Sequence, residues 1–467
     1  MGEGLQGKSS KTKNQMTTTE RKAVFSLASI YALRMMGLFM ILPVFSLYAE
    51  DLEGVISILV GLAIGIYGLT QALFQIPYGM LSDRYGRKPV ITVGLIIFAL
   101  GSVVAAMSDS ITGVILGRAL QGAGAIAATV MALTADLTRE ERRLTAMAII
   151  GMSIGLAFSV SLVMGPVLNS WIGVDGIFWL TAVMALAAIG VLYLVVPTPV
   201  RSTFHRDAMT APEQLSVVIK DPQLIRLDVG IFLLHLILTA TFVVLPLALR
   251  DQAGLAVESH WAIYLPVMLI AIAIMIPFVI IAESKKRIKE VFGSAILTIA
   301  IAEVVFLVLH QSVPAIVFAL LLFFVAFNVL EATLPSLVAK ISPPDRKGTA
   351  MGVYSSSQFL GAFFGGTLGG WMYGQFGLGA VFGMCAFFAV VWFILSMTMQ
   401  SPRYLSTHMI YVGEVDDKQA RHLVNKLTQV TGVAETIVIC EDKIAYLKVD
   451  LHALDRDALS QYAVNPA

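Results

Sequence analysis

The chain has 467 residues, of which 57% are hydrophobic and 13% are charged, and its formal net charge is +1. A soluble domain is usually about 45–50% apolar and about a quarter charged, so this chain carries more apolar side chain than a soluble interior can bury. The composition therefore excludes an ordinary soluble protein and predicts a chain solvated by lipid. The near-zero net charge indicates no particular partner, and we expect no binding of nucleic acid.

The chain begins with a polar segment, residues 1–20, which is predicted to be disordered and has no signal-peptide cleavage pattern. Twelve apolar runs follow, and a helix needs roughly 20 such residues to cross a bilayer. The runs lie at about 23–48, 57–81, 90–107, 112–135, 145–171, 176–196, 228–249, 261–282, 291–309, 314–338, 349–374 and 378–399. We therefore predict an all-α membrane protein with twelve transmembrane helices.

Positive charges occur in alternate connections between these runs. They are Arg84, Arg87, Lys88, Arg139, Arg142, Arg143, Arg201, Arg206, Lys220, Lys285, Lys286, Arg287, Lys289, Arg346 and Lys347. The other connections are mainly acidic, and Arg250 is their one fixed positive charge. Because Lys and Arg are retained on the cytoplasmic side, we expect a multi-pass protein of the bacterial inner (cytoplasmic) membrane with both termini in the cytoplasm.

The two halves of the apolar region repeat each other. Leu42-Pro43-Val44 in the first run is echoed by Leu245-Pro246-Leu247 in the seventh, and similar echoes link the second with the eighth and the fifth with the eleventh. This predicts two six-helix bundles, residues 21–197 and 227–400, joined by a cytoplasmic linker at 198–226. Duplicated halves around a midplane site are typical of alternating-access carriers.

The composition becomes that of a soluble protein after residue 402. Strands are predicted at 408–413, 435–440 and 443–449, and helices at 416–430 and 454–462, with a tight turn at 441–442. This order predicts a small α/β ferredoxin-like cytoplasmic domain over residues 406–467. Its first loop lacks paired cysteines, so no soft-metal site is expected there. Docking onto the carrier, self-association and ion sensing stay open.

The connection between the second and third runs, residues 79–88, reads G-M-L-S-D-R-Y-G-R-K. It resembles the G-x-L-x-D-R-x-G-R-K loop of the major facilitator superfamily. Residues 118–122, R-A-L-Q-G, resemble the R-x-x-Q-G motif of the same superfamily. Gly151, Gly155, Gly165 and Pro166 resemble the fifth-helix motif of its drug:proton antiporters, although residues 167–169 depart from that pattern. The resemblance, with the tail, implies a drug-efflux-type carrier joined to a ferredoxin-like domain.

A conformational latch is implied by this resemblance. Its candidate residues are Gly79, Asp83, Arg84, Gly86, Arg87, Lys88 and Asp136. Gly79 and Gly86 would allow tight turns and close approach, and Asp83 would face the start of the eleventh helix near Gly348 and Thr349. The plainer interpretation is that Arg84, Arg87 and Lys88 only determine topology.

Ionisable groups inside spans are costly and are candidates for function. Those considered for proton coupling or for the cavity are Arg34, Arg118, His235, Asn328 and Glu331. Glu331 is a proton-site candidate or a structural partner of an arginine. His235 is a titrating group or a histidine satisfied by a backbone carbonyl, and Arg34 lines the cavity or pairs across the halves. Glu303 is expected to be structural.

Aromatic and methionine side chains form faces on the first and tenth runs. The residues are Met35, Met36, Phe39, Met40, Phe323, Phe324 and Phe327. They predict an adaptable apolar pocket or, equally simply, helix packing. The glycines of the eleventh run, at helical spacing, predict close approach of neighbouring helices.

The function predicted by the resemblance is proton-coupled export of small amphipathic molecules. A sugar or metabolite carrier, and a transporter-like sensor that signals through the C-terminal domain, are the alternatives. We expect no enzyme activity, no metal and no cofactor, because the chain has no nucleotide loop, metal-ligand cluster or nucleophile constellation. The expected partners are a small-molecule substrate, protons and the lipid bilayer.

Overall fold

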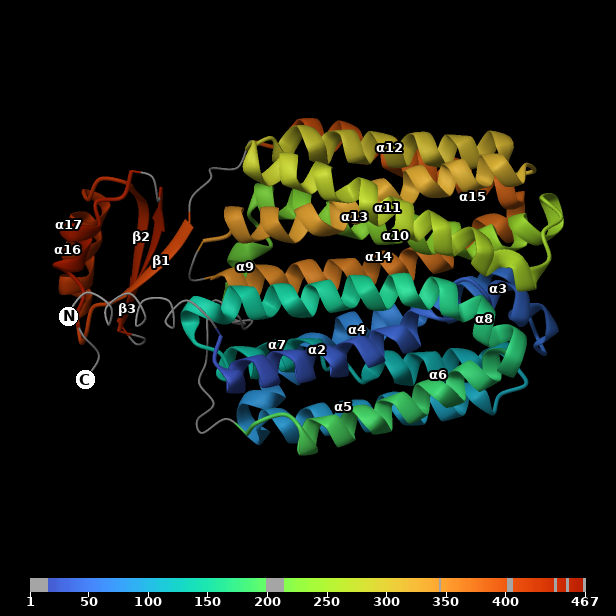
Figure 1. Ribbon diagram of the computed structural model, residues 1–467, viewed down its shortest axis with the longest axis horizontal. Coiled ribbons are helices and arrows are strands. Elements are labelled where there is room, and N and C mark those ends of the chain that lie inside the picture. Colours follow the sequence, from blue (N-terminus) through green and yellow to red (C-terminus); the bar gives the residue numbers. More distant parts are fainter. Residues whose placement is uncertain are drawn as a thin grey trace, which may run out of the picture.

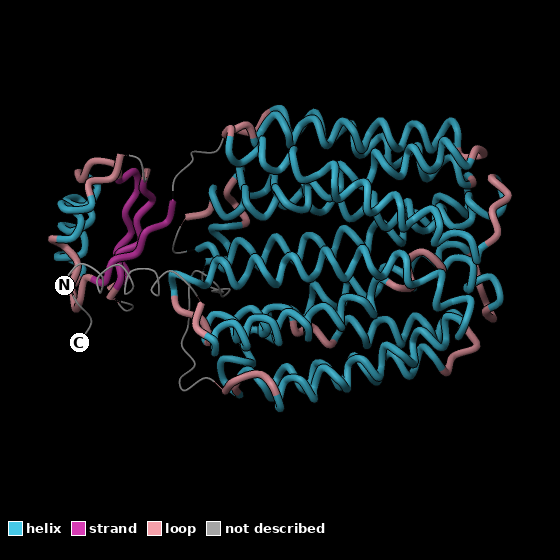
Figure 2. The backbone as a smooth tube through the Cα atoms, in the orientation of Figure 1, coloured by secondary structure: helices cyan, strands magenta, loops and turns pink. Residues whose placement is uncertain are grey.

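The computed structural model describes residues 16–198, 214–343, 346–400, 406–440, 443–450 and 453–464. Its long helices run side by side along one axis, and its strands are confined to a small C-terminal domain at one end (Figures 1 and 2). We call the end of the bundle beside this domain the domain-proximal end, and the end that carries α3 (Phe45–Tyr48) the distal end.

The first bundle contains six further helices. They are α2 (Thr18–Phe39), α4 (Ser57–Tyr85), α5 (Arg87–Ala106), α6 (Ile111–Ala123), α7 (Ala127–Asp136) and α8 (Glu140–Leu194). Thr17 and Glu20 form a capping box at the start of α2. This helix therefore begins inside the segment 1–20 that was expected to be disordered, whereas residues 1–15 lie outside the described part.

The second bundle follows a short helix, α9 (Leu215–Val218). Its helices are α10 (Pro222–Leu247), α11 (His260–Ser284), α12 (Ile288–Leu309), α13 (Val313–Ile341), α14 (Lys347–Phe376) and α15 (Leu378–Met397). Helix α10 begins within the expected linker 198–226 because Asp221 caps its first turn and Pro222 stands at the first helical position. Residues 199–213 of that linker lie outside the described part.

Four expected spans differ in detail from the observed helices. The run 23–48 is interrupted after Phe39, and the run 112–135 is divided between α6 and α7 by Gly124. The runs 145–171 and 176–196 form the single 55-residue helix α8, in which Gly173 alone leaves the helical region (φ 68°, ψ 174°). Only glycine adopts such a backbone without strain.

The Leu-Pro tripeptide of each bundle lies beside an irregular stretch. Pro43 lies in the interruption after α2, and Pro246 precedes a π-helical turn, Ala248–Gln252. Proline removes a helical hydrogen bond and disturbs the turn before it. The irregularity thus falls on the tripeptides that repeat between the halves.

Ten segments of the described chain are long and apolar enough to cross a membrane. The stretch Thr145–Leu194 counts once among them, and the glycine-rich α14 is not included. The structure is therefore largely helical, with many membrane-spanning candidates and a small sheet.

Helix α14 makes close contacts with helices of both bundles. A Cβ atom on Gly366 would lie 2.4 Å from the carbonyl oxygen of Gly61 on α4. On its other side, a Cβ atom on Gly365 would lie 2.2 Å from the carbonyl oxygen of Leu236 on α10. Because such distances exclude any side chain, the glycines allow backbone to meet backbone. The prediction of close approach at this helix is confirmed.

The C-terminal domain has the element order β1 (Ser406–Tyr411), α16 (Asp417–Thr428), β2 (Val433–Ile439), β3 (Ile444–Val449) and α17 (Arg456–Ser460). The order of strands and helices agrees with the prediction, and the expected turn at 441–442 lies outside the described residues. The sheet is antiparallel with β3 in the centre. Its helices lie on the face away from the bundle (Figure 1).

Replacing Gly365 with alanine should lower the free energy of unfolding by about 1–3 kcal/mol, since the added Cβ atom overpacks the contact with α10. Gly379→Ala is the matched control, because its Cβ atom would meet only Leu307 Cδ1 at 3.7 Å. Thermal unfolding of the purified protein in detergent measures both variants. Equal midpoints for the two would contradict the close contact.

Candidate functional site

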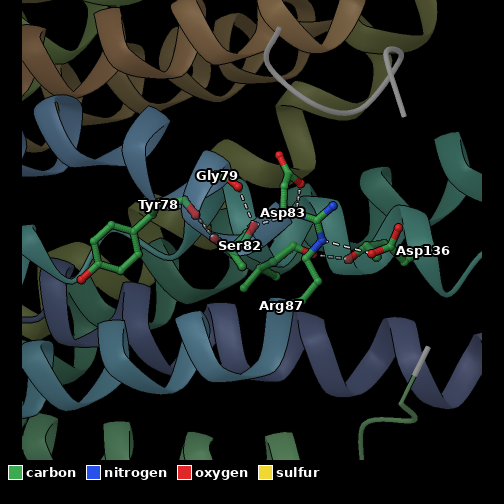
Figure 3. Close-up of polar contacts among 9 residues, drawn as sticks. Tyr78, Gly79, Ser82, Asp83, Arg87 and Asp136 are labelled. Atoms are coloured by element: carbon green, nitrogen blue, oxygen red, sulfur yellow. Dashed lines mark hydrogen bonds and ion pairs between the residues drawn. The ribbon is translucent and has the colours of Figure 1, made fainter. Parts of the chain in front are cut away.

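A charge cluster centred on Arg87 lies at the domain-proximal end of the first bundle. Its guanidinium pairs with Asp83, and its Nε lies 3.1 Å from Asp136 Oδ2. Arg87 Nη1 also donates to Ser82 Oγ (2.6 Å), which in turn donates to the carbonyl of Gly79 (2.6 Å). Figure 3 shows Arg87 between the two carboxylates. Asp136 is fully buried and Arg87 nearly so, whereas Asp83 remains 41% exposed.

The other latch candidates have separate local roles. Gly86 has a φ of 90° between α4 and α5, which explains the need for glycine there. A Cβ atom on Gly79 would meet Ala128 Cβ at an ordinary 3.6 Å, so the expected close approach is not found at that position. Arg84 is exposed beside the ring of Tyr85. Lys88 donates to the carbonyl of Val196 at the end of α8 (2.7 Å).

The two ends of the molecule differ in what joins the bundles. The one hydrogen-bond partner that Asp83 has in the described chain is Arg87, so it does not reach Gly348 or Thr349 in this conformation. At the distal end, Arg250 donates to both carboxylate oxygens of Glu50 (2.7 and 2.8 Å) and so bridges the bundles. Arg250, the exception in the charge pattern, thus has an acidic partner from the other half. No local pattern identifies this pair, because 200 residues separate its members.

A polar cluster inside the second bundle brings together three helices. Its His235 Nδ1 lies 3.3 Å from the carbonyl of Ile231, and Nε2 lies 2.8 Å from Gln358 Nε2 and 3.5 Å from Glu331 Oε1. His235 therefore has both the backbone partner expected for a structural histidine and an acidic neighbour. Asn328 lies one turn before Glu331, and its Nδ2 has no hydrogen-bond partner among the described residues.

Three residues near this cluster were not identified from the sequence. Gln358 and Tyr354 lie on α14, and Asp228 is a buried acid on α10. Asp228 is the first residue of the apolar run 228–249, where a charged residue gives no distinctive signal. Polar residues in glycine-rich α14 gave no distinctive pattern.

Two arginines within the first bundle, Arg34 and Arg118, are buried and form no ion pair in the described chain. Arg118 donates to Gln121 Oε1 (2.6 Å) and to the carbonyl of Ala63 (3.3 Å). Arg34 donates to Gln71 Oε1 (2.5 Å). Neither arginine joins the His235 cluster.

The glycines of the fifth-helix motif do not act alike. A Cβ atom on Gly165 would lie 2.3 Å from the carbonyl oxygen of Met40, so this glycine, beside Pro166, packs against the interruption after α2. Gly151 and Gly155 have open space around their Cβ positions. Of the three glycines in this motif, only Gly165 is required for close packing.

Aromatic side chains from both bundles meet in the core. The ring of Phe158 on α8 lies 4.9 Å from Phe39 and stacks on Phe327 at 5.5 Å between centroids. The aromatic faces expected on the first and tenth runs therefore both pack against Phe158, which lies between Phe39 and Phe327 in this conformation.

A family model of the Major Facilitator Superfamily matches residues 27–290 and 268–408. The chain belongs to the major facilitator superfamily. The chain is 46% identical over 448 residues to the inner membrane transport protein YajR of Escherichia coli (strain K12), covering 96% of this chain and 98% of the relative. The multidrug resistance protein MdtH of Yersinia enterocolitica is 26% identical over 72% of this chain and 83% of its own length.

The fold of this superfamily member also matches a solved structure. A bacterial homolog of the human lysosomal transporter Spinster aligns with a TM-score of 0.68 and 14% identity, over 82% of this chain and 97% of that one. Family membership makes the chain a membrane transporter, so the polar clusters described above are to be interpreted in terms of transport.

Arg87→Met should lower the free energy of unfolding by about 3–5 kcal/mol, because it leaves Asp136 buried without its cation. Arg84→Met, which removes an exposed guanidinium from the same loop, should change stability by at most about 0.5 kcal/mol. Thermal unfolding distinguishes the two. The double variant Arg87→Met/Asp136→Asn should lose less than the sum of its single variants, and strict additivity would show that the pair is not coupled.

Proposed function

We propose that the chain is a proton-coupled secondary transporter that exports small amphipathic molecules by alternating access across a bacterial inner membrane. The observation that carries the proposal is the partly buried His235–Glu331–Gln358 cluster between three helices of the second bundle. The names of the relatives support it, since one is an inner membrane transport protein and another a multidrug resistance protein. Export and proton coupling are the parts that experiment must test.

Twelve transmembrane helices are consistent with the ten apolar segments. The break at Gly173 divides the 50-residue stretch into two spans, and α14, with 30 residues between α4 and α10, adds another. The connections rich in Lys and Arg lie at the domain-proximal end, so we place that end and both termini in the cytoplasm. The distal end then faces the periplasm.

Glu331 is the best candidate for the proton carrier. Its side chain is 32% exposed although it lies within the bundle, so the carboxyl group is only partly enclosed by protein. The neighbouring His235 ring can exchange a proton with Glu331. The amide of Gln358 can reorient when the carboxyl group changes charge. Asp228 on α10 provides a second buried acid of the same bundle.

The pattern of contacts supports alternation between two conformations. Here the bundles are joined at the distal end by Glu50 and Arg250, while the Asp83 cluster stays within its own bundle. This is the arrangement expected of a carrier closed on the periplasmic side. In the opposite state Asp83 would meet the start of α14, as the signature loop implies.

We further propose that the C-terminal domain is ferredoxin-like and docks onto the second bundle. Its strand order β1-β3-β2 is that of a ferredoxin-like sheet without the fourth strand. Lys448 on β3, only 7% exposed, donates to the carbonyls of Lys340 and Ile341 at the end of α13 (3.2 and 3.3 Å). Terminal carbonyls lack helical partners and attract cations, so this lysine caps the helix that carries Glu331.

Glu331→Gln should abolish substrate-driven proton movement in proteoliposomes that contain a trapped pH indicator. The matched control is Glu303→Gln, because Glu303 is also buried but accepts a hydrogen bond from Thr241 (2.9 Å) within its own packing cluster. We expect the control to retain coupling. A panel of amphipathic molecules that crosses the membrane without moving protons would contradict the antiporter. Failure of every molecule to cross would favour the sensor alternative, and sugar-dependent flux the metabolite carrier.

Lys448→Met should increase hydrogen exchange at the end of α13, near residues 338–343, because the capping ammonium is lost. Lys426→Met removes an exposed lysine from α16 and should leave that exchange unchanged. Exchange of the β3 core residue Leu447 reports whether the domain remains folded. Unchanged protection of α13 in a folded Lys448 variant would overturn the docking proposal.

A further inference from the structure

The middle of the first bundle, away from the Arg87–Asp136 pair at its domain-proximal end, holds positive charge without acid. Arg34 on α2 is 1% exposed and Arg118 on α6 is fully buried. The acids between residues 21 and 196 occur only at helix ends and connections, at positions 50, 51, 53, 83, 109, 136, 140, 141 and 175. A buried charge without a partner is strongly unfavourable in a membrane interior. An arginine retained in such a place therefore needs a counter-charge at some stage of its function.

The two arginines differ in how their donors are used. Arg118 places Nε, Nη1 and Nη2 on three acceptors, the carbonyls of Ala63 and Ile64 and the amide oxygen of Gln121. Arg34 has one acceptor, Gln71, while its Nε and Nη1 have no partner among the described residues. Arg118 is thus satisfied by the fold, and Arg34 is not.

The surroundings of Arg34 add donors and rings but no negative group. Its guanidinium carbon lies 5.6 Å from the ring centroid of Tyr67 and 5.4 Å from that of Phe98. These rings reduce the cost of the buried charge. The Tyr67 hydroxyl is itself buried, and its proton has no acceptor among the described residues. Spare donors from two residues therefore gather at one place.

This place lies where the two bundles meet. The ring of Tyr67 is 6.4 Å from Phe359 on α14, and the carbonyl of Phe359 lies 2.3 Å from the Cβ position of Gly68. Substrates of duplicated carriers bind near the midplane between the repeats. Arg34 is covered while α4 and α14 are in contact here, and their separation would expose it.

We propose that Arg34, with the Tyr67 hydroxyl, binds the carboxylate of the transported molecule, so that the substrates are amphipathic organic anions. A carboxylate supplies one negative charge and the acceptor oxygens that Arg34 lacks, and charge-assisted bonds to arginine are strong. The rings of Tyr67 and Phe98 supply an apolar wall for the rest of the molecule. The inference rests on the proposed transport function and specifies its substrate class.

Paired ligands test the proposal on the full-length protein purified in detergent. The probes are benzoate and 4-phenylbutyrate, each compared with its uncharged amide, and the measurement is the shift in unfolding temperature with ligand concentration. We expect the carboxylates to stabilise the wild type and the amides to have little effect. Arg34→Met should weaken carboxylate binding about tenfold or more. Arg226→Met, which removes a partly exposed arginine near the start of α10, should bind like the wild type.

The unfolding temperature of Arg34→Met without ligand shows whether Arg34 also stabilises the fold. Because Arg34→Met removes an uncompensated charge, we expect it to unfold at the wild-type temperature or above. The proposal is overturned if carboxylates and amides act alike on the wild type, or if Arg34→Met binds carboxylate normally. It is also overturned if Arg34→Met and Glu331→Gln are strongly non-additive without ligand, since Glu331 would then be the partner of Arg34. Proton movement driven only by amphipathic cations would refute this inference while leaving the proposed transport function intact.

Discussion

The backbone contact of α14 with helices on both of its sides is the constraint on which the arrangement of the two bundles depends. Glycines on one side of α14 meet α10 within its own bundle, and Gly366 on the other side meets Gly61 of the first bundle. Lipid provides no hydrophobic drive for helices to associate, so close van der Waals contact must do so. A contact between backbones has no interlocking side chains, so it suits a surface where the bundles must separate and rejoin.

Charge is distributed unequally between the bundles. The first buries Arg34 and Arg118 away from its acids, and its buried Asp136 pairs with Arg87 at the domain-proximal end, whereas the second buries Asp228 and Glu303 and partly encloses Glu331. Such groups cost too much in a membrane to be incidental. A carrier that exchanges protons for organic anions would use both sets, with acids to take up protons and an arginine to bind the carboxylate.

The C-terminal domain is connected to this machinery through one helix. Lys448 caps α13, whose other contacts include the ion pair between Lys340 and Glu283 of α11 (2.5 Å). Since α13 also carries Glu331, a change at the domain can reach the second bundle through a single rigid element. Under the proposed docking, Lys448 joins the domain to the second bundle.

The sequence by itself determined the membrane character, the repeated halves, the element order of the tail and the superfamily, because these follow from local composition, period and motif. Only the tertiary structure decided which polar groups meet. Gln358 reaches His235 and Arg250 reaches Glu50 because distant helices pack together, and no local pattern encodes that packing. It also showed that Asp83 stays within its own bundle and that Arg118 is satisfied while Arg34 is not. Satisfaction of a buried charge depends on every helix around it, so it is a property of the assembled fold.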